Sequence, residues 1–215
     1  MEEQSMTIED ILSNDNLNRA YQQVVKNKGA AGIDGMECEA LFSHLRTNGA
    51  QLKESIRNQA YNPLPVKRVE IPKEDGSKRN LGIPTVTDRL IQQAVAQVLT
   101  PIYEKVFHRN SYGFRPGKSA QQAVLKAVEY MNGGYNWVVD IDLEKFFDTV
   151  NHNKLISILN KEIKDGKVLS LIRKFLVSGV MVGEHVEETE IGTPQGGLCR
   201  ARHNPPYDEI DVMPS

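Results

Sequence analysis

The chain is poor in the residues that build metal clusters and disulfide frameworks. Its 215 residues include only two cysteines, Cys38 and Cys199, which stand far apart in the sequence. Such a pair forms neither a zinc cluster nor a disulfide framework, so we expect a reducing, cytoplasmic compartment. The five histidines show no ligand spacing to one another or to a cysteine, which argues against a zinc site and a Cys–His nucleophile pair.

Long apolar runs are missing too. No stretch approaches the ~18 apolar residues that would cross a bilayer, so we expect no membrane partner. The acidic start, Met-Glu-Glu-Gln, is unlike a secretory or mitochondrial leader. With 40% hydrophobic and 25% charged residues, the composition is that of a globular protein and excludes collagen-like, mucin-like and wholly disordered chains.

A basic excess is also lacking, since 26 basic side chains stand against 28 acidic ones. That average argues against a nucleic-acid-binding protein. The charges are segregated, however: residues 105–126 carry five bases and no acid, whereas residues 140–148 carry four acids and one base. This segregation suits an enzyme that handles polyanions, with a basic wall for phosphates and acids for metal ions. Solvated helix faces are the simpler alternative.

Hydrophobic periodicity predicts an α+β fold in which hairpins and helices are segregated rather than alternating. Extended segments are expected at 66–72 and 79–83 around a turn at Asp75-Gly76, at 137–143, and as an acidic hairpin across 180–191. A first helix is expected to begin at Thr7, and residues 13–16 interrupt the helical pattern. A further helix is expected from residue 88 to a break at Pro101. The other expected helices cover 17–25, 37–46, 50–59, 119–131, 154–162 and 167–177.

Two of the expected strands could carry chemistry. Asp140 and Asp142 fall on one face of the 137–143 strand, as paired carboxylates for metal ions would. A solvated edge strand is the alternative. Lys73 and Arg79 flank the turn of the first hairpin and could grip a triphosphate. Charge that protects a hairpin edge from aggregation is the alternative.

Two glycine-containing segments are further candidates. Residues 112–119 interleave aromatic, glycine and basic residues ahead of a helix N-terminus, which is an anion site by geometry and dipole. Residues 192–197 place three glycines and a proline around Gln195, which permits close approach of a ligand backbone. A helix-entry turn and a hairpin exit are the respective alternatives.

Six stretches, in this order, resemble the reverse transcriptases of the group II intron-encoded (maturase) type. They are GAAGIDG at 29–35, IPKEDGSKRNLGIP at 71–84, DRLIQQA at 88–94, SYGFRPGKS at 111–119, DIDLEKFFD at 140–148 and GTPQGG at 192–197. The resemblance covers about residues 7–197. It implies a right-hand polymerase with fingers and an incomplete palm. The implied segments are fingers at 1–86, the first part of the palm at 87–151, a return to the fingers at 152–190, and a truncated palm with a tail unlike the family at 191–215.

The resemblance also implies roles for single residues. Asp142 would be the first catalytic aspartate and would hold Mg²⁺ together with the carbonyl of Leu143, with Asp140 only a neighbour. Phe147 would lie under the sugar and exclude a 2′-hydroxyl, which favours dNTP over NTP. The other implied nucleotide contacts are Lys73, Arg79, Arg115 and Gln195. The implied contacts to the RNA backbone are Lys105, Arg109, Lys118 and Lys126.

The partners implied are group II intron RNA, an RNA template and a DNA primer, in a cytoplasmic ribonucleoprotein. After Gly197 the sequence departs from the family, which continues with a helix and a hairpin carrying Tyr/Phe-Ala-Asp-Asp. No Asp-Asp pair occurs anywhere in this chain. We therefore expect an incomplete two-ion Mg²⁺ site, no polymerase activity of the 215-residue chain alone, and no stable structure from residue 198 onward. Two alternatives stay open: a non-catalytic module that binds intron RNA, and a fragment that self-associates as a homodimer.

Overall fold

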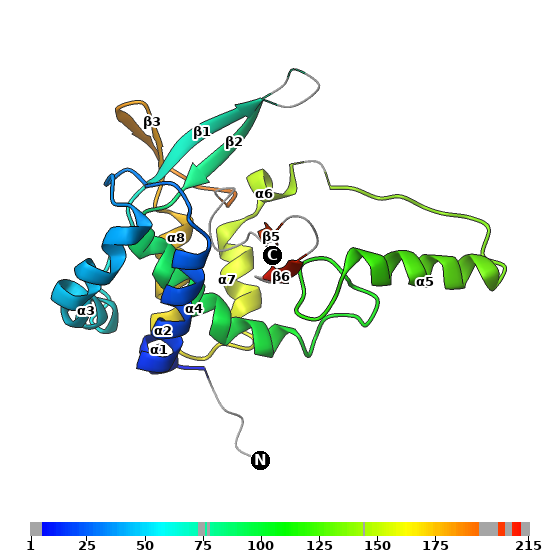
Figure 1. Cartoon of the computed structure of the whole chain (residues 1–215), viewed down its shortest axis with the longest axis horizontal. Coiled ribbons are helices and arrows are strands. Elements are labelled where there is room, and N and C mark those ends of the chain that lie inside the picture. The colour runs from blue at the N-terminus through cyan, green and yellow to red at the C-terminus, as the bar shows by residue number, and fades with distance from the viewer. Residues whose placement is uncertain are drawn as a thin grey trace, which may run out of the picture.

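The computed structural model describes residues 6–72, 76, 78–143 and 145–193, and the backbone alone of 79, 202–204 and 208–211. Helices form most of the body at the left of Figure 1, a small sheet lies at its upper end, and an elongated arm extends to the right. No helix in these described ranges is both long enough and apolar enough to cross a membrane.

The core of the body is built by apolar stripes on several helices. These helices are α1 (Ile8–Leu12), α2 (Asn14–Lys26), α3 (Leu41–Arg57), α4 (Val86–Tyr103), α7 (His152–Leu159) and α8 (Gly166–Leu176). In α4, Leu90, Ile91 and Val95 are fully buried because their spacing puts them on one face. They pack with Ile11 of α1 and Phe175 of α8, so that residues far apart in the sequence share one core.

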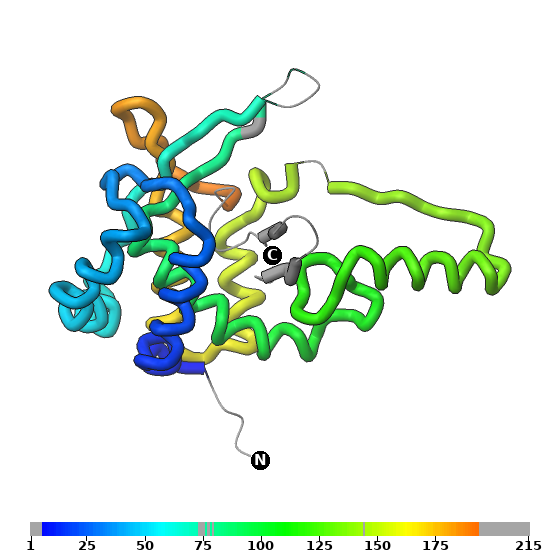
Figure 2. Tube along the Cα trace, viewed as in Figure 1, coloured from blue at the N-terminus to red at the C-terminus, as the bar shows by residue number. Residues whose placement is uncertain are grey.

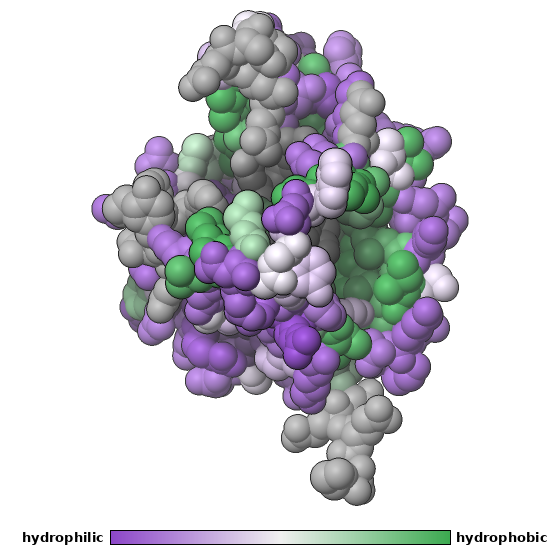
Figure 3. All heavy atoms as spheres, turned by 90° about the vertical axis from the view of Figure 1, so that its right-hand side faces the viewer, coloured by the Kyte–Doolittle hydropathy of each residue, from purple (hydrophilic) through white to green (hydrophobic). Residues whose placement is uncertain are grey.

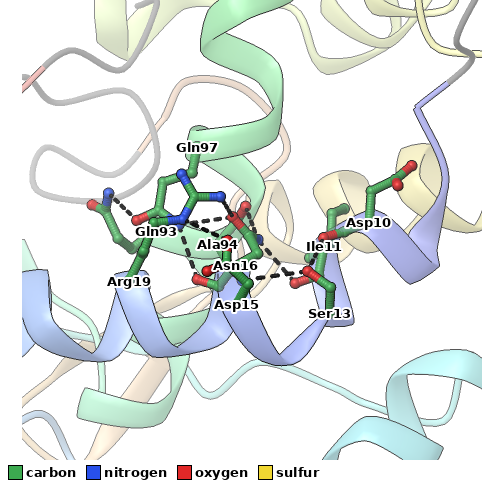
Figure 4. A network of polar contacts seen from close by, with 9 residues as sticks. All are labelled: Asp10, Ile11, Ser13, Asp15, Asn16, Arg19, Gln93, Ala94 and Gln97. Atoms are coloured by element: carbon green, nitrogen blue, oxygen red, sulfur yellow. Dashed lines mark hydrogen bonds and ion pairs between the residues drawn. The ribbon is translucent and has the colours of Figure 1, made fainter.

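Polar side chains begin the helices and join them to one another. Thr7 and Asp10 form the capping box of α1, and the Ser13 hydroxyl accepts a hydrogen bond from the backbone N–H of Asn16. The buried Asn16 side chain donates to the carbonyls of Ile11 and Ala94, each at 2.9 Å, which ties the start of α2 to α4 (Figure 4). The expected helix start at Thr7 is confirmed, whereas α2 begins at Asn14, within the stretch 13–16 that was expected to interrupt the helices.

Two helix boundaries differ from the sequence prediction. A single helix, α3, preceded by a 3₁₀ turn (Cys38–Ala40), runs through Gly49 and replaces the two helices expected there. One glycine in a helix costs only ~1 kcal/mol against alanine, which a 17-residue helix tolerates. Likewise α4 continues past Pro101 to Tyr103, since a proline in the last turn removes only one hydrogen bond.

The sheet has the strand order β2-β1-β3-β4 and joins the two expected hairpins. Strands β1 (Val66–Pro72) and β2 (Lys78–Ile83) are antiparallel, as are β3 (Val180–Val182) and β4 (His185–Glu187). The two hairpins meet where β3 runs parallel to β1, and Arg68 forms an ion pair with Glu187 at 3.0 Å across that junction.

The arm consists of α5 (Ala120–Asn132) and an extended segment that runs back from it to residue 143 (Figure 2). Ser119 caps α5 as expected, but no residue of this helix is buried. The strand expected at 137–143 is wrong, because the described chain provides no neighbouring strand for it to pair with. Its apolar side chains are therefore exposed, with Trp137 at 94% and Val139 and Ile141 at 81%.

A short helix, α6 (Phe146–Thr149), follows the arm and was not expected from the sequence. Within residues 198–215, the backbone forms two short antiparallel strands, β5 (Arg202–Asn204) and β6 (Asp208–Asp211). Their presence differs from the expectation that no stable structure forms after residue 198. The other residues of that stretch lie outside the described part of the chain.

Candidate nucleotide-binding site

A cavity of about 1050 Å³ lies between the sheet and the segment around α6. Arg68 on β1 and Lys78 and Asn80 on β2 form one wall. Asp142, at the end of the arm, and Asp148 of α6 line it as well. Other lining residues come from β1 and β2, from β3, and from the end of β4 and the segment that follows it, with acids at 187, 188 and 190. The cavity therefore brings a basic hairpin together with an acidic wall.

Local backbone geometry brings the acidic motif to this cavity. Lys145, which also lines the cavity, has a φ of 50°, in the left-handed region that non-glycine residues rarely adopt. This residue precedes α6 directly, so the chain turns sharply between Asp142 and Asp148. The two carboxylates consequently share one cavity although six positions separate them in the sequence.

The two hairpin cations that line the cavity, Arg68 and Lys78, already have partners. Arg68 pairs with Glu187, and Lys78 pairs with Glu70, whose hydrogen bond raises the pKa of the Lys78 ammonium group. Both pairs are partly exposed, so each contributes little to stability and can exchange its carboxylate for a phosphate at small cost. The hairpin can therefore present two cations to a polyanion in this cavity.

The oxygen donors near Asp142 suit a hard cation but are few. The Asp142 carboxylate is exposed and accepts a hydrogen bond from the backbone N–H of Leu143 at 2.9 Å. Carboxylate and carbonyl oxygens are the ligands that Mg²⁺ prefers. Nowhere among the described residues do three acidic, histidine or cysteine side chains come together to hold a metal ion. The described residues therefore fit a partial Mg²⁺ site, not a full two-ion site.

Backbone hydrogen bonds join residues 192–193 to α6 and to the residue that follows it. The backbone N–H of Thr193 donates to the carbonyl of Phe147 at 2.7 Å, and that of Gly192 donates to the carbonyl of Val150 at 2.8 Å. The buried ring of His152 lies with Nε2 at 2.6 Å from the Gly192 carbonyl, which also accepts. Phe147 and the glycine-rich loop, both expected at the nucleotide, are therefore joined in space.

The sequence did not reveal His152 and Thr193 as residues of this site. Forty positions separate His152 from Gly192, and no local pattern links the two. Thr193 lines the cavity, and its buried hydroxyl oxygen has no hydrogen-bond partner among the described residues. The only local signal near His152 is Asn151, whose side chain caps α7.

Arg115 lies elsewhere than the sequence resemblance implied. It does not line the cavity in the described part of the chain, and only 7% of it is exposed. Its guanidinium binds the carboxylate of Glu104 at 2.9 Å and donates to the carbonyls of His108 and Ser111. Glu104 raises the pKa of Arg115 through this hydrogen bond. The geometry gives Arg115 a structural role in the connection between α4 and α5, and the place in a nucleotide pocket that the resemblance implied stays a prediction.

The residues expected to contact RNA lie on and beside the arm. Lys105 and Arg109 follow α4 and are exposed. Lys118 lies over the ring of Tyr112 at 5.1 Å, whereas Lys126 on α5 is paired with Glu129. Lys73 and Gln195 lie outside the described residues, as does the side chain of Arg79.

Comparison with known proteins identifies the family of the chain. A profile of the family "Reverse transcriptase (RNA-dependent DNA polymerase)" matches residues 71–199, which include the end of β1, all of β2, the acidic motif and the glycine-rich loop. The chain belongs to the reverse transcriptase family. The group II intron-encoded protein LtrA of Lactococcus lactis subsp. cremoris is 41% identical over 180 residues, which make up 83% of this chain and 30% of LtrA.

Other reverse transcriptase relatives show the same partial overlap. Protein YkfC of Escherichia coli K12 is 35% identical over 189 residues, covering 85% of this chain and 49% of its own length. Nuclear intron maturase 2 of Arabidopsis thaliana is 37% identical over 103 residues, or 48% of this chain and 14% of its own. The chain thus spans about a third to a half of the length of LtrA and YkfC.

The fold is shared with a solved reverse transcriptase structure. A chain of the partial Cas6-RT-Cas1–Cas2 complex superposes with a TM-score of 0.58 at 24% identity, covering 89% of this chain and 32% of that one. The α+β reverse transcriptase fold expected from the sequence is therefore confirmed.

Proposed function

We propose that this chain forms the fingers and the first part of the palm of a group II intron type RNA-directed DNA polymerase. The cavity next to Asp142 is its dNTP site. One observation carries the proposal: Asp142 lines the same cavity as Arg68 and Lys78 of the β1–β2 hairpin. A bound triphosphate needs both cations for its phosphates and a carboxylate for the accompanying metal ion.

Within this proposal the residues divide into three groups. Asp142 and the carbonyl of Leu143 hold Mg²⁺, which neutralises phosphate charge when it is bound. Phe147 lies under the sugar and disfavours a 2′-hydroxyl by lack of space. Lys73 and Arg79 grip the triphosphate, and Gln195 contacts the sugar–base region. The fingers comprise 1–86 and 152–190, the palm begins at 87–151, and 191–215 continues the palm incompletely before a tail unlike the family.

Nucleotide binding tests the proposal directly. We expect the 215-residue chain to bind dTTP in the presence of Mg²⁺, as measured by equilibrium dialysis, and Asp142→Asn to weaken this binding by about tenfold. Asp165→Asn is a control at the start of α8, away from the cavity. Equal binding by Asp142→Asn and the unsubstituted chain would contradict the proposed site.

Polymerase activity itself is expected to be absent from the 215-residue chain. One catalytic aspartate cannot hold the two-ion geometry that joins attacking and leaving oxygens, and the sequence contains no Asp-Asp pair. A primer-extension assay with poly(rA)/oligo(dT), dTTP and Mg²⁺ should therefore show no incorporation. Robust extension would refute this expectation while leaving the nucleotide site in place.

A second candidate function is that of a non-catalytic module that binds intron RNA. The exposed basic side chains beside the arm favour it. Lys105 and Arg109 are exposed there, and Lys118 over Tyr112 adds a cation beside an aromatic face. Contacts with phosphates release counterions, so the logarithm of the binding constant should fall linearly with the logarithm of the salt concentration. Filter binding across salt measures this slope, and a flat line would exclude phosphate contacts.

A further inference from the structure

The segment that leads into the glycine-rich loop touches α6 at several points. Residues 191–193 follow the β3–β4 hairpin, and the isolated bridge between Asn151 and Ile191 brings them beside the residues that follow α6. The N–H groups of Gly192 and Thr193 then donate to Val150 and Phe147, respectively. The carbonyl of Phe147, the residue proposed to lie under the sugar, is thus bound by the segment that carries Gln195 two positions further on.

The backbone approaches very closely at this contact. Gly192 has a φ of 82°, in the left-handed region, and a Cβ added to it would lie 2.8 Å from the carbonyl oxygen of Asp148. The segment therefore approaches α6 as closely as a chain without a side chain can. A group that fixes the orientation of the Gly192 carbonyl adds to the two backbone hydrogen bonds that hold this contact.

That group is the imidazole of His152. It belongs to the first turn of α7, is 5% exposed, and places Nε2 at 2.6 Å from the Gly192 carbonyl. A carbonyl only accepts, so Nε2 carries the proton and donates. Gly192 is thus held on both sides, by its N–H through Val150 and by its carbonyl through His152.

We propose that His152 is a positioning residue of the nucleotide site: by holding the Gly192 carbonyl it aligns Phe147 and sets discrimination against a 2′-hydroxyl. This inference rests on the proposed function, because Phe147 must lie at the sugar. Without the ring N–H, the Gly192 carbonyl can rotate, the Thr193 N–H leaves the Phe147 carbonyl, and Phe147 gains freedom to admit the larger ribose. His152 acts through Gly192 and Thr193 and touches no substrate itself.

Two variants separate this role from general support of the fold. His152→Leu keeps the volume and removes the donor, whereas His152→Gln restores an N–H at nearly the same distance from the backbone. His44→Leu is the matched control, because His44 is a half-buried histidine on α3 that does not line the cavity. All variants are made in the 215-residue chain.

Two measurements on these chains test the proposal. We expect His152→Leu to speed amide hydrogen exchange at Thr193 by about tenfold, the worth of one buried hydrogen bond, and His152→Gln to return it toward the original rate. The ratio of the dissociation constants of UTP and dUTP, which differ only in the 2′-hydroxyl, should fall toward one in His152→Leu and recover in His152→Gln, as measured with Mg²⁺ by equilibrium dialysis. His44→Leu should change neither quantity.

Each other outcome overturns the inference in a different way. Faster exchange with an unchanged UTP to dUTP ratio would make His152 a purely structural residue. An altered ratio with unchanged exchange at Thr193 would mean that His152 acts by another route. If the unsubstituted chain binds both nucleotides equally, the sugar-selecting role of Phe147 fails and takes the inference with it. If it binds neither, the proposed site itself fails, and that result is visible before any variant is compared.

Discussion

Two glycines, one lining the cavity and one elsewhere, adopt a backbone conformation that other residues rarely adopt. Gly192 and Gly35 both have positive φ, of 82° and 70°, but only Gly192 has backbone close by. A Cβ at Gly192 would meet Asp148, whereas nothing lies within 4 Å of one at Gly35. Substitutions at these two glycines therefore separate two contributions to the free energy of unfolding, that of the left-handed backbone and that of a steric clash.

Alanine substitution at these glycines should destabilise the chain to different extents. We expect Gly35→Ala to lower the free energy of unfolding by about 1 kcal/mol, the cost of the left-handed conformation. Gly192→Ala should lower it by a further ~1–3 kcal/mol, since the backbone of α6 must shift. Urea denaturation measures both. Equal losses would mean that the segment at Gly192 moves aside freely.

Asp88 is a second residue whose surroundings set its chemistry. It is 1% exposed and accepts hydrogen bonds from the hydroxyls of Tyr61 at 2.6 Å and Thr85 at 2.6 Å. Burial raises the pKa of its carboxyl, and these hydrogen bonds offset the rise only in part. Burial and the neighbouring carboxylate likewise raise the pKa of the Tyr61 hydroxyl.

The raised pKa of Asp88 predicts a pH-dependent stability with a definite sign. The folded chain holds this proton more tightly than the unfolded chain, so the stabilising contribution is complete below the ordinary aspartate pKa. It is lost as the pH rises through the raised value. We therefore expect the free energy of unfolding of Asp88→Asn to decline less than that of the unsubstituted chain between about pH 4 and pH 7.

Tyr61→Phe provides the matched variant for this pH series. It removes a hydrogen bond to the ionised carboxyl, so the pKa of Asp88 should rise further and the decline should extend to higher pH. Chemical denaturation across the pH series measures all three chains. Parallel curves for Asp88→Asn and the unsubstituted chain would show that Asp88 titrates at its ordinary pKa.

At the scale of elements, the connection between α4 and α5 depends on one buried ion pair. Arg115 forms several hydrogen bonds to Glu104 and to two carbonyls of the connecting loop, and it lies over the ring of Phe107 at 5.1 Å. The connection has few apolar contacts of its own, since no residue of α5 is buried. Arg115 therefore substitutes for a core at the base of the arm.

Removal of this guanidinium should be costly for stability and neutral for nucleotide binding. We expect Arg115→Leu to lower the free energy of unfolding, because the Glu104 carboxylate and two backbone carbonyls lose their partner. Arg115→Lys should recover little, since an ammonium cannot make the forked contacts. The control Arg19→Leu breaks an exposed pair with Asp15 and should cost less than ~0.5 kcal/mol.

Denaturation and dTTP binding together decide the role of Arg115. Loss of dTTP binding at unchanged stability would instead restore the nucleotide role that the sequence resemblance implied.

At the scale of the whole molecule, the arm stands out because it exposes large apolar side chains and an extended backbone. Figure 3 views the molecule from this side, and hydrophobic side chains appear there among hydrophilic ones. The extended segment also leaves its backbone without a sheet partner in the described chain. The large apolar residues exposed on the arm are Val124, Leu125, Val128, Tyr130, Met131, Tyr135, Trp137, Val138, Val139, Ile141 and Leu143.

An exposed apolar surface with an unpaired extended segment predicts self-association of the 215-residue chain. We expect its mass, measured by light scattering, to rise with concentration. Val139→Glu should weaken the association by more than about tenfold, because association would bury the introduced charge. Phe42→Glu replaces an exposed apolar residue on α3, outside the arm, and should have little effect. A mass independent of concentration would exclude this surface as a self-association site.

The sequence by itself determined the local elements, because their signals lie within a few residues. Thr7 and Ser119 cap helices where expected, and the hairpin around Asp75-Gly76 forms as its alternation predicts. The order of the six motifs also indicated the family, since the order of residues along a chain does not depend on tertiary contacts. These features need no partner from a distant part of the chain.

Only the tertiary structure decided which residues meet. The 137–143 segment has the alternation of a strand but lacks a partner in the described chain, and a strand needs one. Arg115 carries the positive charge that could bind a phosphate, but its guanidinium forms an ion pair with Glu104. His152 reaches the site only because the chain returns to it forty residues later at Gly192. Contacts between distant residues depend on the path of the whole chain, which no local pattern encodes.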